Sequence, residues 1–180
     1  MKSLNGADMT FVLICAALVM FMIPGLALFY GGMVKSKNVL STTLHSYAAL
    51  VILSVQWILI GGSLAFGKDI FGFIGSLDLS FVNKMGVLPN GDYSTTISGL
   101  LFIVFQMMFA IVTAAVISGA FAERMRFPAF LLFMLLWSTF VYDPIAHWVW
   151  GGAGENAGWL KQLGVQDFAG GLVVEINSGI

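Results

Sequence analysis

The stretch from Thr10 to Gly32 reads TFVLICAALVMFMIPGLALFYGG and contains no charged side chain. A membrane-spanning helix needs about 20 consecutive, mostly apolar residues, so this stretch is long enough to cross a bilayer. It is too long for the apolar core of a signal peptide, and no small-residue cleavage site follows it, so we expect a retained span. Pro24 removes one backbone N–H donor inside this helix and predicts a kink there.

The composition of the whole chain agrees with a membrane protein. Of its 180 residues, 59% are hydrophobic and 9% are charged, and the mean hydropathy is +0.94. A soluble domain carries about 25% charged residues. The net charge of −1 provides no basic field for nucleic acid. The single cysteine, Cys15, excludes an internal disulfide framework and a multi-cysteine metal site. We expect no metal and no cofactor.

Five apolar stretches have the composition of membrane spans. They cover approximately residues 9–33, 42–66, 96–121, 128–150 and 167–180. We therefore expect an all-α, polytopic membrane helix bundle that forms one domain over residues 1–180. As a helix, the fifth stretch would cover only about 21 Å. Since the hydrocarbon core is roughly 30 Å thick, we expect this stretch to be a truncated span.

The charges of the loops predict the orientation. Lys35 and Lys37 follow the first stretch in a short loop, and Arg124 and Arg126 follow the third stretch on the same side. On the opposite side, aspartates offset the lysines of the long segment 67–95. Because basic residues in short loops mark the cytoplasmic side, we expect the N-terminus to lie outside.

Glu175 is an ionisable residue within the apolar fifth stretch, DFAGGLVVEINSG, which begins at Asp167. In a helix it would lie about 12 Å from Asp167, near the middle of the membrane. A carboxyl group at this depth marks an ion pathway, which we favour, or is protonated and hydrogen-bonded between helices. Asp167 is expected to cap the helix N-terminus, and the same position would attract cations to the outer mouth.

Aromatic residues form a second candidate site. Phe105 and Phe109 are four residues apart and share one face of the third helix. Trp148 and Trp150 lie at the outer end of the fourth stretch. From the spacing alone, we interpret the phenylalanine pair as ordinary apolar surface, and tryptophans are expected at a membrane interface in any case. An aromatic face can also bind a small cation, and the sequence alone does not decide between these interpretations.

The sequence contains no pattern that is typical of an enzyme. His45 and His147 are the only histidines, and they are expected near opposite ends of the bundle, too far apart for a shared metal site. No Ser–His–Asp, P-loop or zinc pattern occurs. We therefore do not expect catalysis.

Four segments together resemble the ammonium transporter family (Amt, also called Mep, with the Rh proteins as relatives). They are PGLALFYGGMVKSKNVL from Pro24, GAFAERMRF from Gly119, AHWVWGG from Ala146 and DFAGGLVVEINSG from Asp167. The resemblance implies an eleven-span fold with its N-terminus outside, of which this chain resembles the first half, cut within span five. It also implies a homotrimer in the plasma (inner) membrane, with one pore for ammonium or ammonia in each subunit between two inverted halves. A PII-type regulator on the cytoplasmic face is a further implied partner.

The same resemblance implies roles for single residues. Phe109 matches the phenylalanine that gates the outer vestibule, and Trp150 matches the tryptophan that recruits ammonium by cation–π contact. Phe105 lies one turn from Phe109, and Asp167 matches an acidic residue that holds this site in shape. The positions that match the lower pore lining are Leu26, Phe29 and Tyr30.

Glu175 departs from the family's motif, D-F-A-G-G-x-V-V-H-I-N, because it stands where the motif has the first of two pore histidines. Some fungal members also have glutamate there. In the pore, a glutamate would accept a proton or, when ionised, attract a cation. Two alternatives to transport stay open: an ammonium-sensing membrane domain of a signalling protein, and a non-conducting fragment.

Overall fold

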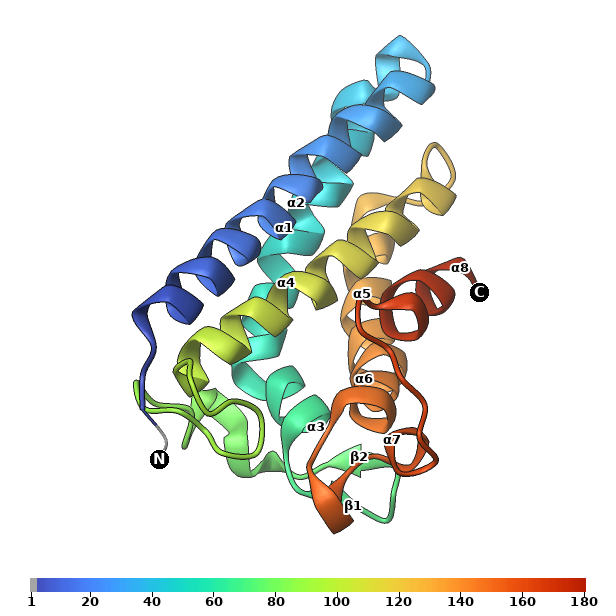
Figure 1. The fold of residues 1–180 in the computed structure, drawn as a ribbon. Coiled ribbons are helices and arrows are strands. Elements are labelled where there is room, and N and C mark those ends of the chain that lie inside the picture. Colours follow the sequence, from blue (N-terminus) through green and yellow to red (C-terminus); the bar gives the residue numbers. More distant parts are fainter. Residues whose placement is uncertain (1–2) are drawn as a thin grey trace.

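The computed structural model describes residues 3–180, apart from the side chain of Glu155. Helices running between two ends make up most of the molecule, and two short strands and several loops lie at the end that holds the N-terminus (Figure 1). Within residues 3–180, four helical segments are long and apolar enough to cross a membrane: Gly6–Met33, Ser36–Phe66, Gly99–Phe121 and Phe127–Trp150. These segments agree with the expected all-α membrane bundle.

Helix α1 (Gly6–Met33) is the first of these segments. It begins at Gly6 rather than at the expected Met9, because the Oδ1 atom of Asn5 accepts a hydrogen bond from the backbone N–H of Ala7 at 2.9 Å and caps the helix. Pro24 lies inside α1, which continues past it to Met33.

The second and fourth segments each consist of two α-helices joined by a π-helical turn. In the second, a 3₁₀ turn (Ser36–Asn38) leads into α2 (Val39–Gln56), a π-helical turn (Trp57–Gly61) and α3 (Gly62–Phe66). In the fourth, α5 (Phe127–Trp137) leads into a π-helical turn (Ser138–Tyr142) and α6 (Asp143–Trp150). A π-helical turn inserts into an α-helix and often marks a functional position.

Short elements connect the spans. Strands β1 (Asp69–Ile70) and β2 (Ile74–Gly75) pair antiparallel, with Asp69 opposite Gly75. The other connecting elements are a 3₁₀ segment (Leu77–Val82), a 3₁₀ turn (Gly154–Asn156) and helix α7 (Trp159–Gln162). The third span consists of helix α4 (Gly99–Ser118) and its 3₁₀ extension (Gly119–Phe121).

The fifth stretch starts its helical conformation later than expected. A π-helical turn covers Gly171–Ile176, and helix α8 (Asn177–Gly179) follows it. The helix expected from Asp167 therefore begins at Gly171. The reason is local: Gly170 has a left-handed backbone with φ of 99°, which favours glycine and separates Asp167 from the helix.

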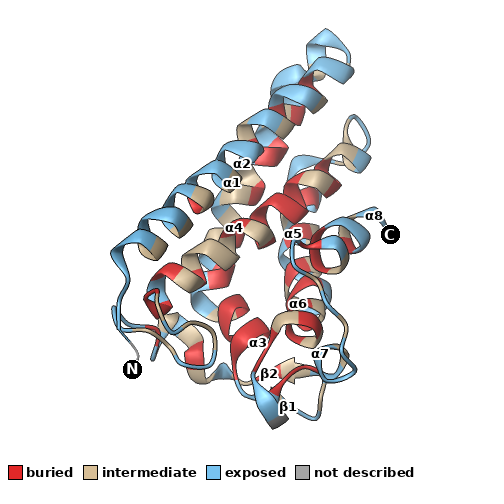
Figure 2. Cartoon of the chain, viewed as in Figure 1, coloured by how far each residue is buried: buried red, intermediate tan, exposed pale blue. Residues whose placement is uncertain are grey.

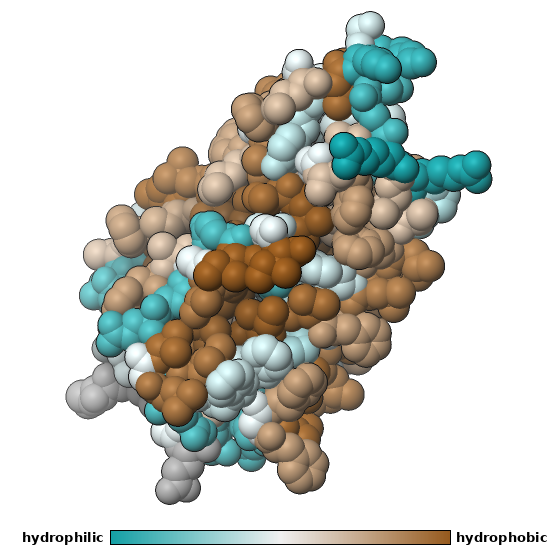
Figure 3. Space-filling model, turned by 90° about the vertical axis from the view of Figure 1, so that its right-hand side faces the viewer, coloured by the Kyte–Doolittle hydropathy of each residue, from teal (hydrophilic) through white to brown (hydrophobic). Residues whose placement is uncertain are grey.

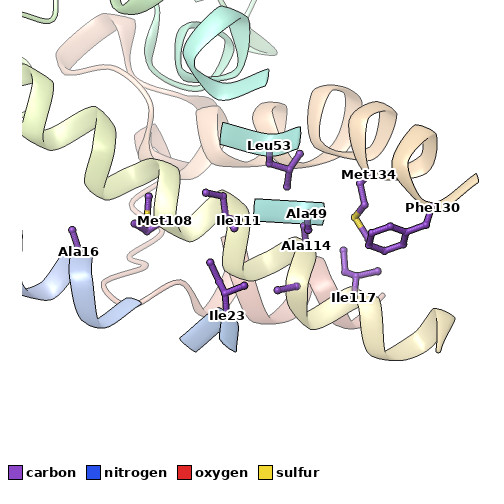
Figure 4. Packing of buried hydrophobic residues seen from close by; sticks show 11 residues of the cluster. Ala16, Ile23, Ala49, Leu53, Met108, Ile111, Ala114, Ile117, Phe130 and Met134 are labelled. Carbon is purple, nitrogen blue, oxygen red and sulfur yellow. The ribbon is translucent and has the colours of Figure 1, made fainter. Parts of the chain in front are cut away.

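Helix α4 lies at the centre of the packed core. Its residues Ile111 and Ala114 are fully buried and lie toward Ile23 of α1 and Leu53 of α2 (Figure 4). Phe130 of α5, also fully buried, extends this cluster toward the other end of α4. Figure 2 shows the same arrangement, with α4 largely buried and one side of α1 exposed along its length. Small residues such as Ala114 allow helices to approach closely in a membrane.

The outer side of α1 is an extended apolar surface. Phe11, Leu18, Phe21 and Leu28 are each more than half exposed. The space-filling view of another face, the one on the right of Figure 1, also shows apolar side chains across the middle, with hydrophilic side chains mainly toward the ends (Figure 3). Soluble monomers rarely expose contiguous apolar surface on this scale. A lipid or protein environment around α1 accounts for it.

A carboxylate joins two loops at the end that is expected to be cytoplasmic. The Oε1 atom of Glu123 accepts hydrogen bonds from the Asn38 side chain at 2.8 Å and from the backbone N–H of Lys35 at 2.9 Å. The bond from Asn38, followed by the bond from Lys35, lowers the pKa of Glu123. The carboxylate is therefore ionised at neutral pH and connects the loop after α1 to the loop after α4.

Gly158→Ala tests the packing of the α6–α7 connection. A Cβ atom at Gly158 would lie 2.0 Å from the carbonyl oxygen of His147 and 2.5 Å from that of Trp148, and neither backbone atom can move freely. We expect the free energy of unfolding to fall by about 1–3 kcal/mol, as for other overpacked sites. Thermal denaturation in detergent micelles, followed by tryptophan fluorescence, measures the change. Gly86→Ala is the matched control, because a Cβ atom at Gly86 meets nothing within 4 Å. Equal midpoints for the two variants would contradict this packing.

Candidate functional site

A cavity of about 450 Å³ lies between the first half of α4, the end of α6 and the segment that precedes the fifth stretch. We call it the vestibule cavity. It lies toward the end of the molecule that is expected to be outside. Its lining comprises Phe66, Asp92, Tyr93, Phe102, Phe105, Gln106, Phe109, Val149, Trp150, Lys161, Val165, Gln166, Asp167, Phe168 and Ala169. All four residues expected at the outer site, Phe105, Phe109, Trp150 and Asp167, therefore line one cavity.

Three aromatic rings form a continuous series along the wall of the cavity. The ring centroids of Phe105 and Phe109 are 5.0 Å apart, and those of Phe109 and Trp150 are 6.0 Å apart. Both pairs pack edge to face, with interplanar angles of 85° and 74°. This is a favoured geometry for aromatic pairs. The four-residue spacing in α4 places the two phenylalanines on the same face, where α6 brings Trp150 against them.

The indole of Trp150 is fixed from its other side by the segment around Asp167. Its Nε1–H donates a hydrogen bond of 2.9 Å to the backbone carbonyl oxygen of Asp167. A buried tryptophan N–H usually finds such a partner. The hydrogen bond and the contact with Phe109 together orient the indole ring at the cavity.

The carboxylate of Asp167 holds the start of the fifth stretch. Its Oδ1 accepts from the N–H of Gly170 at 2.6 Å, and its Oδ2 accepts from those of Leu172 at 2.9 Å and Val173 at 3.0 Å. The first N–H groups of a helical turn have no partner within it, and the positive end of its dipole favours an anion. Asp167 supplies that anion from outside the helix, across the left-handed turn at Gly170.

Two further polar groups of the cavity were not expected from the sequence. The Oε1 atom of Gln106 is buried and has no hydrogen-bond partner within residues 3–180. A single amide in an otherwise apolar span was a signal that could have identified it. Tyr93 donates its hydroxyl hydrogen to the carbonyl oxygen of Phe66 and accepts from the N–H of Gly152 at 3.1 Å. Burial raises the pKa of Tyr93 to about 12, so this hydroxyl is neutral at physiological pH.

Lys161 was also not expected at the cavity. Its Nζ atom donates hydrogen bonds to the backbone carbonyl oxygens of Gly152 at 2.8 Å and Trp150 at 3.2 Å. Partial burial lowers the pKa of Lys161 from its ordinary value. Asp92 also lines the cavity, where it is exposed. The cavity therefore carries charges of both signs.

A second set of contacts holds α6 to the second span. The fully buried His147 has its Nδ1 atom 3.0 Å from the carbonyl oxygen of Ala65 and its Nε2 atom 2.9 Å from Oδ1 of Asp69. Nearer the middle of the span, the side-chain amide of Gln56 donates to Oδ2 of the buried Asp143 at 2.7 Å. These contacts hold the second span to the fourth at two levels.

The residues expected in the lower pore are not brought together. Within residues 3–180, no hydrogen bond or ring contact joins Glu175 to Leu26, Phe29 or Tyr30. The Tyr30 hydroxyl donates to the carbonyl oxygen of Val116 at 3.0 Å, which ties α1 to α4. Phe29 is 61% exposed, and Leu26 packs against the core. Glu175 is exposed on the π-helical turn that Asp167 initiates.

The histidines lie as the sequence predicts, at different ends. His45 has its Nδ1 atom 2.6 Å from the carbonyl oxygen of Ser41 and packs edge to face against Phe130. His147 lies near the vestibule end. In the part of the chain that the structure describes, no group of three or more His, Cys, Asp or Glu side chains is placed to hold a metal ion.

Comparison with known proteins gives consistent matches along the chain. The model of the Ammonium Transporter Family matches residues 10–180. An ammonium transporter of Bacillus subtilis (strain 168) is 58% identical over 173 residues, which cover 96% of this chain and 41% of that protein. The matched proteins are named as transporters rather than as enzymes. This chain spans about 40% of the length of the curated relatives that it matches.

Solved structures show the same fold. The crystal structure of Saccharomyces cerevisiae Mep2 matches with a TM-score of 0.85 and 37% identity, covering 98% of this chain and 38% of that one. A structure described as a sensor Amt protein matches with a TM-score of 0.82 and 34% identity, covering 94% of this chain and 41% of that one. The arrangement of helices described above therefore matches about 40% of each of these solved chains.

Asp167→Asn tests the hydrogen bonds that hold the cavity. An amide group replaces one carboxylate oxygen, so at least one backbone N–H among Gly170, Leu172 and Val173 loses its acceptor. We expect the free energy of unfolding to fall by about 1.5–3 kcal/mol, the range for hydrogen bonds to charged groups. Thermal denaturation and amide hydrogen exchange at these three residues measure the effect. Asp92→Asn, at an exposed position of the cavity lining, should leave both unchanged. Unchanged exchange in Asp167→Asn would contradict the assigned role.

Proposed function

Because this chain belongs to the Ammonium Transporter Family, we propose that it forms part of a pore that moves ammonium or ammonia across a membrane. The observation that carries the proposal is the vestibule cavity, where Phe109 and Trp150 pack edge to face and Asp167 fixes the indole. An aromatic cavity suits a small cation that must lose water before it enters hydrocarbon.

Recruitment of ammonium is the first step of this proposal. Moving a bare ion into an apolar medium is costly unless other groups replace its water. The face of Trp150 attracts a cation through the electrostatics of its ring. The side chain of Gln106 also lines this cavity, and its Oε1, buried and without a hydrogen-bond partner within residues 3–180, would become an acceptor for the cation if the side chain turned toward it. Aromatic and amide groups together would thus replace part of the hydration shell.

Passage past the aromatic pair is the second step. Phe105 and Phe109 follow one face of α4 from the cavity toward the centre of the bundle. In this proposal Phe109 is the gate, and displacement of its ring admits one ammonium at a time. The edge-to-face packing against Trp150 supports this role, because the recruiting ring and the gate are in contact.

Glu175 is proposed as the ionisable group of the pore itself. It follows the Asp167-bound turn, so the segment that fixes the recruitment site also sets the position of this carboxyl group. A glutamate would accept a proton from ammonium or attract the cation when ionised. Leu26, Phe29 and Tyr30 of α1 are proposed as the lining of the lower pore.

The same proposal extends to the membrane location, the assembly and the regulatory partner of the protein. The chain is part of a multi-pass membrane protein, with four apolar segments in the described residues. We propose the plasma (inner) membrane as its location and a homotrimer as its assembly. The exposed apolar side of α1 supports a neighbouring helix or lipid there. A PII-type regulator is proposed for the cytoplasmic end, where the loops after α1 and α4 meet at Glu123.

A sensing function is the second candidate. The likeness to a sensor Amt protein favours it, at 34% identity over 94% of this chain. A sensor needs the recruitment cavity and requires little conduction. A non-conducting fragment is the third possibility. Measurements on the full-length gene product separate these possibilities.

An ammonium jump on proteoliposomes tests conduction. We expect a saturable current with ammonium that is absent with potassium, and we expect Trp150→Leu to raise the half-saturation concentration by about threefold to thirtyfold, from the loss of one cation–π contact. Specific ammonium binding without current would favour the sensor. Absence of both binding and current would overturn the proposal.

Glu175→Gln tests the role of the pore carboxyl group. The amide has nearly the same shape but neither accepts a proton nor carries charge, so we expect ammonium flux to fall at least tenfold. Glu175→His is the matched variant, because imidazole also accepts a proton, and it should retain flux. The readouts are the initial current and the uptake of labelled methylammonium. Unchanged flux in Glu175→Gln would exclude any need for this charge.

A further inference from the structure

Lys161 places a primary ammonium group, the chemical relative of the proposed substrate, at the edge of the vestibule cavity. Among residues 3–180, it is the only cationic side chain that lines this cavity. Its Nζ atom donates to the carbonyl oxygens of Gly152 and Trp150, at 2.8 and 3.2 Å. The same residue, Trp150, therefore gives its backbone to Lys161 and its ring to the cavity.

The two carbonyl groups lie at the C-terminal end of α6, which attracts cations. Helix α6 ends at Trp150, and the last carbonyl groups of a helix have no partner within the helix. The helix dipole adds partial negative charge at this end. Lys161 reaches this end from α7, across the 3₁₀ turn Gly154–Asn156, and satisfies it with a charged donor.

The two acidic residues of the cavity, Asp167 and Asp92, do not pair with this lysine. The oxygens of Asp167 already accept three backbone N–H groups, and Asp92 is exposed. In the described residues, neither carboxylate forms an ion pair with Lys161. Among the described residues, the positive charge of Lys161 is therefore balanced by carbonyl dipoles rather than by a paired carboxylate.

We propose that Lys161 is a fixed positive charge that lowers the affinity of the vestibule for ammonium by electrostatic repulsion. By binding the carbonyl oxygens at the end of α6, its ammonium group holds a fixed positive charge in the cavity that a second cation must enter. This inference rests on the proposed recruitment of ammonium at Trp150. It adds a residue that tunes the site, with free ammonium or a small alkylammonium as the ligand.

The size of the effect follows from Coulomb's law. A cavity of this volume is roughly 10 Å across, and two unit charges at that separation in an effective dielectric constant of about 40–80 repel enough to weaken binding about twofold to fourfold. Salt screens charges over about 8–10 Å at physiological ionic strength. The effect of Lys161 should therefore decrease as salt is added, whereas a packing effect would not.

Three variants of the full-length protein separate charge from structure. Lys161→Gln and Lys161→Met remove the charge and keep most of the side-chain length, and Lys161→Arg keeps the charge. Ammonium chloride is the probe. The half-saturation concentration is measured from proteoliposome currents and, independently, from the change in tryptophan fluorescence on binding.

The expected result is a twofold to fourfold lower half-saturation concentration in Lys161→Gln and Lys161→Met, with Lys161→Arg close to wild type. The difference should fall toward onefold as sodium chloride rises from 20 to about 500 mM. A higher or unchanged half-saturation concentration in both neutral variants would overturn the inference, as would a decrease that does not depend on salt. If wild-type protein binds ammonium without current, the transport proposal fails and the binding comparison still decides the role of Lys161.

Discussion

The carboxylate of Asp167 is the interaction on which the vestibule depends. Three backbone N–H groups at the start of a helical turn converge on it, and such groups have no partner within the turn. Its own carbonyl oxygen holds the indole of Trp150, so one residue fixes both the start of the fifth stretch and the ring at the cavity. The edge-to-face contact with Phe109 then depends on that ring. A single short segment thus connects the outer site to the turn that carries Glu175.

The length of the apolar stretches and the spacing of residues along a helix made most of the fold predictable. Four of the five apolar stretches correspond to long helical segments, because a bilayer sets a minimum helix length that composition reveals. The spacing of Phe105 and Phe109 was enough to place them on one face, and the structure adds Trp150 to the same wall. The resemblance to the ammonium transporters carried the assignment of the outer site, since the residues alone left both aromatic interpretations open.

Local backbone conformation was the part that the sequence could not provide. The left-handed Gly170 delays the helix to Gly171, and a glycine is compatible with many other conformations. Lys161 looks like an ordinary loop lysine in the sequence, because its acceptors are backbone carbonyl groups that only the folded chain brings near. The role of Glu175 and the lower-pore positions stays a prediction. Glu175 makes no hydrogen bond or ring contact with Leu26, Phe29 or Tyr30 in the described residues, so these side chains do not form a pore by themselves.

The π-helical turn Ser138–Tyr142 sets the rotation of α6 about its axis and therefore the direction of the Trp150 indole. Each residue of an α-helix advances by about 100° around its axis, so the extra residue of a π-helical turn shifts the phase of everything after it. Deleting one residue there would rotate α6 by roughly a quarter turn and carry the indole away from α4. A deletion in this span therefore changes the vestibule more than a substitution does. A related protein that lacks one residue between Ser138 and Tyr142 would have a differently arranged vestibule.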